Sequence, residues 1–249
     1  MFHLALYSSS IGPSAALAQV TQVADPVIAP AGNGFLVGVL SKLMRVAGVG
    51  TDLTRAQLNS ASLRDFAPFD VNPVNVGTAI ESPARLCRFD DNPIPLAVNE
   101  ELDAFAVQSN VGAQLARVAV WFADMPVRPF TGRMFTVRWT NATALVANAW
   151  TAFTPTLDNG IPSGSFAIVG ARAISAGGLF FRFIPRGGTP NRPGGFAYQT
   201  QDGASFDGQR YGEMGEWMRF TNTTIPSIEM FSGLADATQQ GYLDLVQVG

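Results

Sequence analysis

The sequence has very few of the residues on which most enzyme chemistry depends. Its 249 residues include one histidine, His3, at the extreme N-terminus, and one cysteine, Cys87. A Ser-His-Asp or Cys-His system needs an imidazole within reach of its nucleophile, and zinc sites need several His or Cys ligands. One cysteine also excludes an intrachain disulfide. We therefore expect no catalytic residues, no metal site of the His or Cys type and no cofactor.

Charge is also scarce. Charged residues make up 14% of the chain, against roughly 25% in an average soluble domain. The net charge of −3 provides no basic surface, so no specific nucleic-acid binding is expected. Lys42 is the only lysine beside 15 arginines, which favours paired or stacked cations over simply solvated ones. No run approaches 18 apolar residues, so no transmembrane helix is predicted. The low charge indicates a surface that is neutral or covered by neighbours.

What the sequence does contain is an apparent internal repeat. Arg88 and Phe89 match Arg219 and Phe220, 131 positions later, and Ile94-Pro95 matches Ile225-Pro226 at the same offset. After five extra residues in the first copy, the offset falls to 126. The ordered matches predict a duplication of about half the chain. The aligned phenylalanines, which we expect to form the core of each copy, are three pairs: Phe35 with Phe166, Phe89 with Phe220, and Phe105 with Phe231.

The hydrophobic pattern predicts an all-β fold. In residues 134–139, Phe135, Val137 and Trp139 alternate with Met134, Thr136 and Arg138, and residues 117–122 form a strongly apolar run. Both patterns are typical of strands. Recurrent prolines between residues 65 and 95 exclude a long helix there. We predict an N-terminal arm at 1–31, a first sandwich at 32–124, a linker at 125–133 and a second sandwich at 134–249. The arm is predicted to hold a short helix from Ala15 to Val23, capped by Ser14 and packed against the body, a neighbouring subunit or lipid.

Paired carboxylates are the remaining candidates for chemistry. Glycoside hydrolysis needs only two carboxylates at the right separation. The pairs in this chain are Asp90 with Asp91, Glu100 with Glu101, and Glu213 with Glu216. In the repeat, Asp90 and Asp91 align with Thr221 and Asn222, which favours a solvated turn. A weak Ca²⁺ site, built from the oxygens of Asp90, Asp91 and Asn92, is the other hypothesis for this turn.

The two copies, joined by Pro126-Val-Arg-Pro129 and preceded by an Ala-rich segment, resemble the double jelly-roll major capsid proteins of tailless icosahedral viruses. That lineage includes lipid-containing bacteriophages and adenovirus. The resemblance implies two tandem jelly rolls, three chains forming a pseudo-hexagonal capsomer, and a structural rather than enzymatic role. It also implies assembly in the host cytoplasm and residence in the virion shell. Partners would be other copies, neighbouring capsomers, minor capsid or vertex proteins and, in many members, an internal membrane.

Two alternatives stay open at this stage. A β-sandwich carbohydrate-binding module or glycosidase would be a monomer with clustered exposed aromatic residues and a cleft holding two carboxylates. A capsid protein with a single jelly roll and an unrelated second half would make the repeat accidental.

Overall fold

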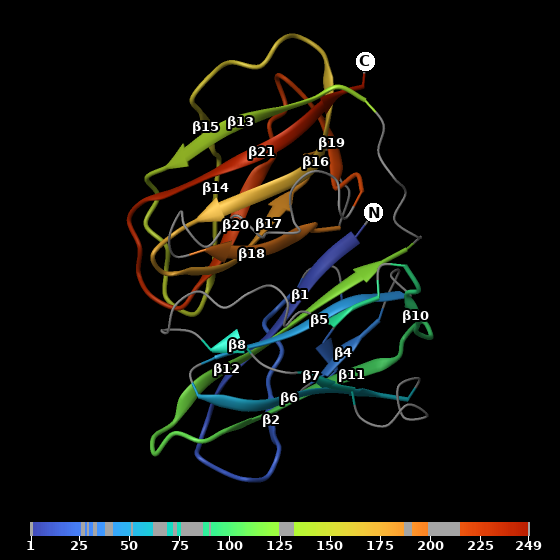
Figure 1. Ribbon diagram of the computed structural model, residues 1–249, viewed down its shortest axis with the longest axis vertical. Helices are drawn as coiled ribbons and strands as arrows, with labels where there is room; N and C mark the ends of the chain where they lie inside the picture. The colour runs from blue at the N-terminus through green and yellow to red at the C-terminus, as the bar shows by residue number, and fades with distance from the viewer. Residues whose placement is uncertain are drawn as a thin grey trace. The chain divides into compact units, whose positions relative to one another are not determined.

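The computed structural model describes residues 2–25, 28, 30–31, 34–37, 42–50, 52–61, 69–71, 74–75, 87–89, 91–124, 132–186, 191–198 and 215–248. The regular elements in this part of the chain are all β-strands (Figure 1), which confirms the all-β class. The chain divides into two compact units, Phe2–Pro126 and Val127–Gly249. Within the described ranges, no helix is long and apolar enough to cross a membrane.

The first unit consists of two sheets. The strands of one are β1 (Phe2–Ile11), β5 (Lys42–Gly50), β8 (Val74–Asn75), β9 (Cys87–Arg88), β10 (Ile94–Pro95) and β12 (Gln114–Ala123). They run in the order β1-β12-β5-β10, with β8 and β9 also pairing with β5. The strands of the other are β2 (Ala18–Val20), β3 (Pro30–Ala31), β4 (Gly34–Leu36), β6 (Leu53–Ser60), β7 (Phe69–Val71) and β11 (Glu101–Gln108). Their order is β3-β4-β11-β6-β7, with β2 also on β11.

The described part of the second unit has nine strands. They are β13 (Met134–Asn141), β14 (Trp150–Phe153), β15 (Thr156–Leu157), β16 (Ser165–Ile174), β17 (Gly178–Ile184), β18 (Gly194–Tyr198), β19 (Met218–Thr221), β20 (Ser227–Ser232) and β21 (Gln239–Gln247). Their order is β14-β20-β17-β18-β16-β21-β13-β15, with β19 also on β16. The link between β18 and β16 is a short parallel contact of two residue pairs.

The main strands of the two units pair in the same order. The first unit joins β1-β12-β5-β9 and β2-β11-β6-β7, and the second joins β13-β21-β16-β19 and β14-β20-β17-β18. When β3, β4, β8, β10 and β15 are left aside, eight described strands remain in each unit. If these eight strands are numbered in chain order within each unit, one sheet of each unit has the order first-eighth-third-sixth, and the other has the order second-seventh-fourth-fifth. Figure 1 shows β1, β12 and β5 side by side in one unit, and β13, β21 and β16 in the other.

Each unit has its own apolar core. In the first, Val20, Ala104 and Leu58 stand opposite one another on neighbouring strands and are fully buried. In the second, the core is rich in aromatic side chains. The centres of the Trp139 and Phe153 rings lie 5.8 Å apart, and the Trp217 ring stacks on the Phe181 ring with their centres 6.1 Å apart. Large aromatic side chains dominate core energetics by the apolar area they remove from water.

Strand β13 confirms the alternation predicted for residues 134–139. Val137 and Trp139 are buried, whereas Met134, Thr136 and Arg138 are exposed. The strand pairs with β21 over its whole length, from Met134 opposite Val246 to Asn141 opposite Gln239. When apolar side chains recur at every second residue and one face is buried, the pattern specifies both that the segment is a strand and the register in which it pairs.

The predicted N-terminal helix is wrong. Residues 2–11 form the strand β1, paired with β12 over all ten residues, and Ala18–Val20 is a strand as well. Phe2 and Leu4 on one face of β1 and Ala5 on the other are all buried, so apolar residues run continuously and hide the period of two. Of the three surfaces expected for this apolar segment, namely the body, a neighbouring subunit or lipid, the structure shows β1 packed in the body through its pairing with β12.

One pair of the predicted repeat is wrong in register. Phe35 lies in β4, which pairs with β11, whereas Phe166 lies in β16, which pairs with β21 and β19. By pairing order the counterpart of β16 is β5, not β4. Short runs of alternating apolar residues resemble one another in any strand, and they carry little register information.

Candidate functional site

The six predicted phenylalanines occupy different environments. Phe166, Phe220 and Phe231 are buried, and the Phe166 and Phe220 rings lie 5.9 Å apart. Phe89 is partly buried against the core of the first unit. Phe105 is also partly exposed, and it alternates with the core residue Ala104, so it faces away from the core. The Phe35 side chain lies outside what the structure describes.

The carboxylate pairs occupy separate structural positions. Asp91 and Asn92 are exposed in a turn, where the N–H of Asn92 donates to the carbonyl of Phe89 at 3.0 Å; Asp90 lies outside the described residues. Glu100 is buried, and its Oε2 accepts from the N–H of Ala97 at 2.8 Å. Across the described ranges, no three His, Cys, Asp or Glu side chains are grouped to hold a metal ion.

Glu216, the described member of the third pair, is bonded to Arg219 from the repeat. Arg219 donates from Nε and Nη2 to the two carboxylate oxygens of Glu216, at 2.8 and 2.9 Å. Glu213 lies outside the described residues. Glu216 is therefore one partner of a surface ion pair on the β19 side of the second unit.

His3 is a structural residue. Its Nε2 lies 2.9 Å from Oδ2 of Asp25, and both side chains are almost completely buried. We expected the histidine to be peripheral because of its position in the chain. Instead it connects β1 to the segment that follows β2, which no local pattern could have indicated.

Buried arginines account for part of the unusual arginine content. Arg45, Arg117 and Arg182 are at most 4% exposed. Burial lowers the pKa of Arg117 to about 10, so this side chain remains cationic at neutral pH. The Arg182 guanidinium lies over the Trp150 ring, 4.1 Å from its centroid, and donates from Nε to Glu229. A planar guanidinium can stack and hydrogen-bond at once, which a lysine cannot do.

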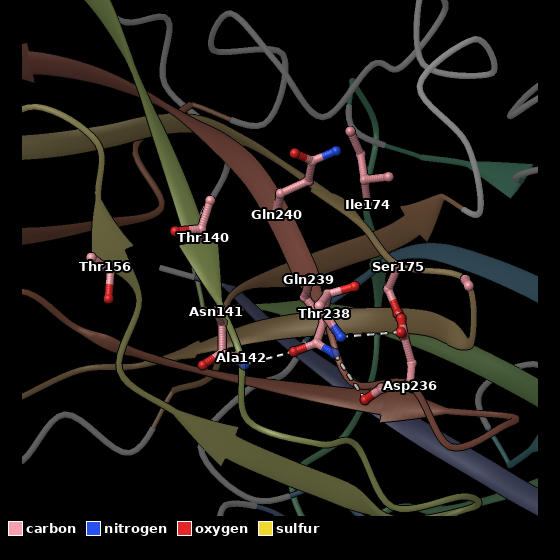
Figure 2. Close-up of a pocket in the computed structure, with 11 residues that line it drawn as sticks. Thr140, Asn141, Ala142, Thr156, Ile174, Ser175, Asp236, Thr238, Gln239 and Gln240 are labelled. Carbon is pink, nitrogen blue, oxygen red and sulfur yellow. Dashed lines mark hydrogen bonds between the residues drawn. The ribbon is translucent and has the colours of Figure 1, made fainter.

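A polar pocket of about 610 Å³ lies at one end of the second unit. Its lining comes from the ends of β13, β16 and β21, from β15 and from the turns next to them (Figure 2): Thr140, Asn141, Ala142, Thr156, Ile174, Ser175, Ala176, Asp236, Thr238, Gln239 and Gln240. The amide of Asn141 donates to Oε1 of Gln239 at 2.6 Å. Seven of the eleven described lining residues carry a neutral hydroxyl or amide group, and one, Asp236, carries a carboxylate.

Asp236 holds two turns together. It accepts a hydrogen bond from the Ser175 hydroxyl and one from the N–H of Thr238 at 3.2 Å. Burial raises the pKa of this carboxyl, but the hydrogen bonds from Ser175, Thr238, Gly177 and Ala176 outweigh burial and leave the pKa below its ordinary value of 3.8. A single carboxylate engaged in this way has no partner for acid–base glycoside chemistry. No local pattern indicates this cluster, because Ser175 and Asp236 are 61 positions apart.

We expect Asp236→Asn to destabilise the second unit at neutral pH, because the neutral amide is a weaker acceptor for these hydrogen bonds. A lowered pKa means that the stabilisation is complete above the ordinary value of 3.8 and disappears as pH falls through the folded-state value. The melting temperatures of wild type and variant should therefore converge in acid. Asp91→Asn, at an exposed turn, is the matched control and should melt like wild type. A gap that stays constant down to about pH 2 would contradict this role.

Comparisons with known proteins leave the family open. No protein-family model matches the chain, and no curated protein matches it. Among solved structures, it is similar to the major capsid protein P2 from bacteriophage PM2, with 10% identity, a TM-score of 0.24, and coverage of 100% of this chain and 98% of that one. That likeness is too small to carry a functional conclusion by itself.

Proposed function

We propose that this protein is the major capsid protein of a tailless icosahedral virus, built from two tandem jelly rolls that arose by duplication. Three copies form a capsomer with six similar lobes, because each chain contributes two similar units. The role is structural, and the protein carries out no reaction.

The observation that carries the proposal is the repeated strand order. The order first-eighth-third-sixth against second-seventh-fourth-fifth is that of a jelly roll, and both units have it. Two units of unrelated origin have many other ways to pair eight strands. A repeat of the whole order within one chain supports duplication more strongly than any sequence match.

The sequence matches that agree with this order add support. Arg88 in β9 and Arg219 in β19 both lie in the sixth strand of their unit, paired with the third. Phe105 in β11 and Phe231 in β20 both lie in the seventh. The residues of the sixth strands are related by the offset of 131, and those of the seventh strands by the offset of 126, the two offsets found in the sequence.

Assembly within a virion determines the proposed partners. They are other copies of this chain, neighbouring capsomers, minor capsid or vertex proteins, and an internal membrane where the virus has one. The proposed location is the capsid shell, after assembly in the host cytoplasm. A low content of charged residues suits a surface that is largely occupied by neighbouring protein.

Electron-microscope images of the purified protein test the proposal. We expect class averages along the threefold axis with six similar lobes, alternating between first and second units. Particles with two lobes, corresponding to single chains, would contradict it.

A carbohydrate-binding module is the second candidate, and the polar pocket favours it. Hydroxyl and amide side chains such as Thr140, Asn141 and Gln240 are suited to binding sugar hydroxyls. The pocket lining includes no aromatic residue, so it lacks a stacking platform of the kind such modules use. A monomer that binds polysaccharide would raise this candidate above the first.

A further inference from the structure

In the first unit, the sheet containing β11 has an open outer face. Val20, Ala104 and Leu58 point into the core, so the alternate residues point outward. This outer row consists of Gln19, Phe105, Gln57 and Asp70, opposite one another on β2, β11, β6 and β7. Gln19 and Asp70 are exposed, and Phe105 is half-buried. By contrast, the outer residues Leu4 and Trp121 of the other sheet are at most 1% exposed.

The open face of the first unit carries an excess of negative charge. Arg55 donates to both carboxylate oxygens of Asp70, at 2.7 and 2.8 Å. Asp103 accepts from Gln19 at 3.0 Å, and Glu101 is exposed on the same side of β11. Among the described residues of this face, one arginine therefore accompanies three carboxylates. We call these residues, together with Gln57 and Phe105, the acidic face.

In the second unit the open face belongs to the other sheet. Val137, Leu243 and Ala171 form a buried row on β13, β21 and β16. The next row, pointing outward, consists of Arg138, Tyr242 and Arg172. The sheet containing β20 is different, because its outer residues Phe231 and Phe180 are completely buried.

Arginines dominate the open face of the second unit. The Arg172 guanidinium lies 5.7 Å from the centre of the Tyr242 ring. Arg138 pairs with Asp158 at 2.7 Å, and Arg219 pairs with Glu216 at 2.8 Å. In both pairs the arginine is the more exposed partner.

Among the described residues of this second surface, the exposed charge is mainly positive. Asp244 is the third carboxylate; it is fully buried and accepts from Thr136 at 2.6 Å. Three arginines thus accompany three carboxylates. Because Asp244 is buried and Asp158 and Glu216 are the less exposed partners of their ion pairs, guanidinium groups make up most of the exposed charge. We call the surface formed by Arg138, Arg172, Arg219, Tyr242 and Met134 the arginine face.

We propose that the acidic face of one copy binds the arginine face of another copy. The charges are complementary, and each face offers a half-buried aromatic ring, Phe105 or Tyr242, that a partner can cover. Both faces belong to the same chain, which makes a second copy the partner that fits. The contact joins two different patches, so it is heterologous. Copies joined in this way use every acidic face and every arginine face only when they form a closed ring. The inference rests on the proposed function, which sets that ring at three chains.

A charge-swap experiment tests the contact. The acidic-face variant carries Glu101→Lys and Asp103→Lys, and the arginine-face variant carries Arg138→Glu and Arg219→Glu. We expect each to raise the concentration for half-dissociation of the trimer about tenfold or more, because like charges then oppose one another. Combining all four substitutions should restore wild-type assembly to within about threefold. Asp91→Lys, an exposed reversal outside both faces, is the matched control and should leave assembly unchanged.

A measurement on the wild-type protein avoids any variant that fails to fold. Raising ionic strength from about 0.05 M to about 1 M should weaken the trimer, because salt screens charges across an exposed contact. Trimers that ignore both salt and charge reversal would overturn the proposed contact while leaving the capsid role intact. A wild-type protein that is monomeric at all concentrations would instead overturn the capsid role itself.

Discussion

Deleting residues 2–11 is expected to abolish cooperative folding of the first unit. The deletion removes β1, which pairs with β12 over its whole length and buries Phe2, Leu4, Leu6 and Tyr7. Each large side chain contributes about 1.5–3 kcal/mol through burial, and a typical domain is stable by only about 5–15 kcal/mol. The loss is therefore comparable to the whole stability of a typical domain. Circular dichroism and limited proteolysis should show that residues up to Pro126 are degraded.

The connection after β1 provides the control for that deletion. Residues 12–16 are exposed, and replacing them with an equally long Gly/Ser segment should leave both units folded. A β1 deletion that still unfolds cooperatively at the wild-type temperature would show that the N-terminal strand is dispensable. It would revive the expectation that residues 1–31 are a peripheral arm.

Phe231→Ala should cost about 3–5 kcal/mol in the free energy of unfolding, the usual range for a buried aromatic. Phe231 is completely buried; its ring lies 5.6 Å from Trp150, and it stands opposite Phe180. The alanine side chain would leave a cavity within a row of aromatic rings that cannot close around it. Urea denaturation of wild type and variant, at a dilution where both are monomeric, measures the difference.

Phe105→Ala is the matched comparison, because Phe105 lies in the corresponding strand of the first unit. Its neighbours across the sheet are Gln19 and Gln57, and its ring is partly exposed, so we expect a cost of about 1 kcal/mol. If the two variants lost equal amounts of unfolding free energy, the greater burial of Phe231 compared with Phe105 would be contradicted. A large effect of Phe105→Ala on trimer formation alone would fit its place on the acidic face.

The strands that could be predicted well from the sequence are those with one buried face and one solvent-exposed face. In β13, Val137 and Trp139 are buried between exposed residues, so the period of two is visible in the sequence. In β1 it is hidden, because residues on both faces are buried. Ser14 does accept a hydrogen bond from the N–H of Ala16 at 3.0 Å, but this local bond forms a turn and not a helix cap.

The repeat could be found from sequence only where its matches were specific. Arg88-Phe89 and Arg219-Phe220 combine a charge with an aromatic residue, and their arginines fall in corresponding strands, as the pairing order shows. The match of Phe35 to Phe166 relied on apolar alternation alone, and it joined strands that do not correspond. Specific pairs resist register error because a shift of one residue exchanges the two faces of a strand.

The candidate surfaces could not be predicted, because they depend on long-range pairing. Arg138, Tyr242 and Arg172 form one row only after β21 inserts between β13 and β16. Likewise, Gln19 reaches Asp103 across 84 positions. Composition indicated a surface covered by neighbours, but it could not say which faces remain open.

The native mass of the purified wild-type chain tests the central claim most directly. Native mass spectrometry should give three times 26.5 kDa, or larger multiples of that trimer. Dilution should release single chains without a stable dimer, because a heterologous ring loses its closure when one copy leaves. A soluble species of 26.5 kDa at every concentration would contradict the assembly on which the capsid role depends.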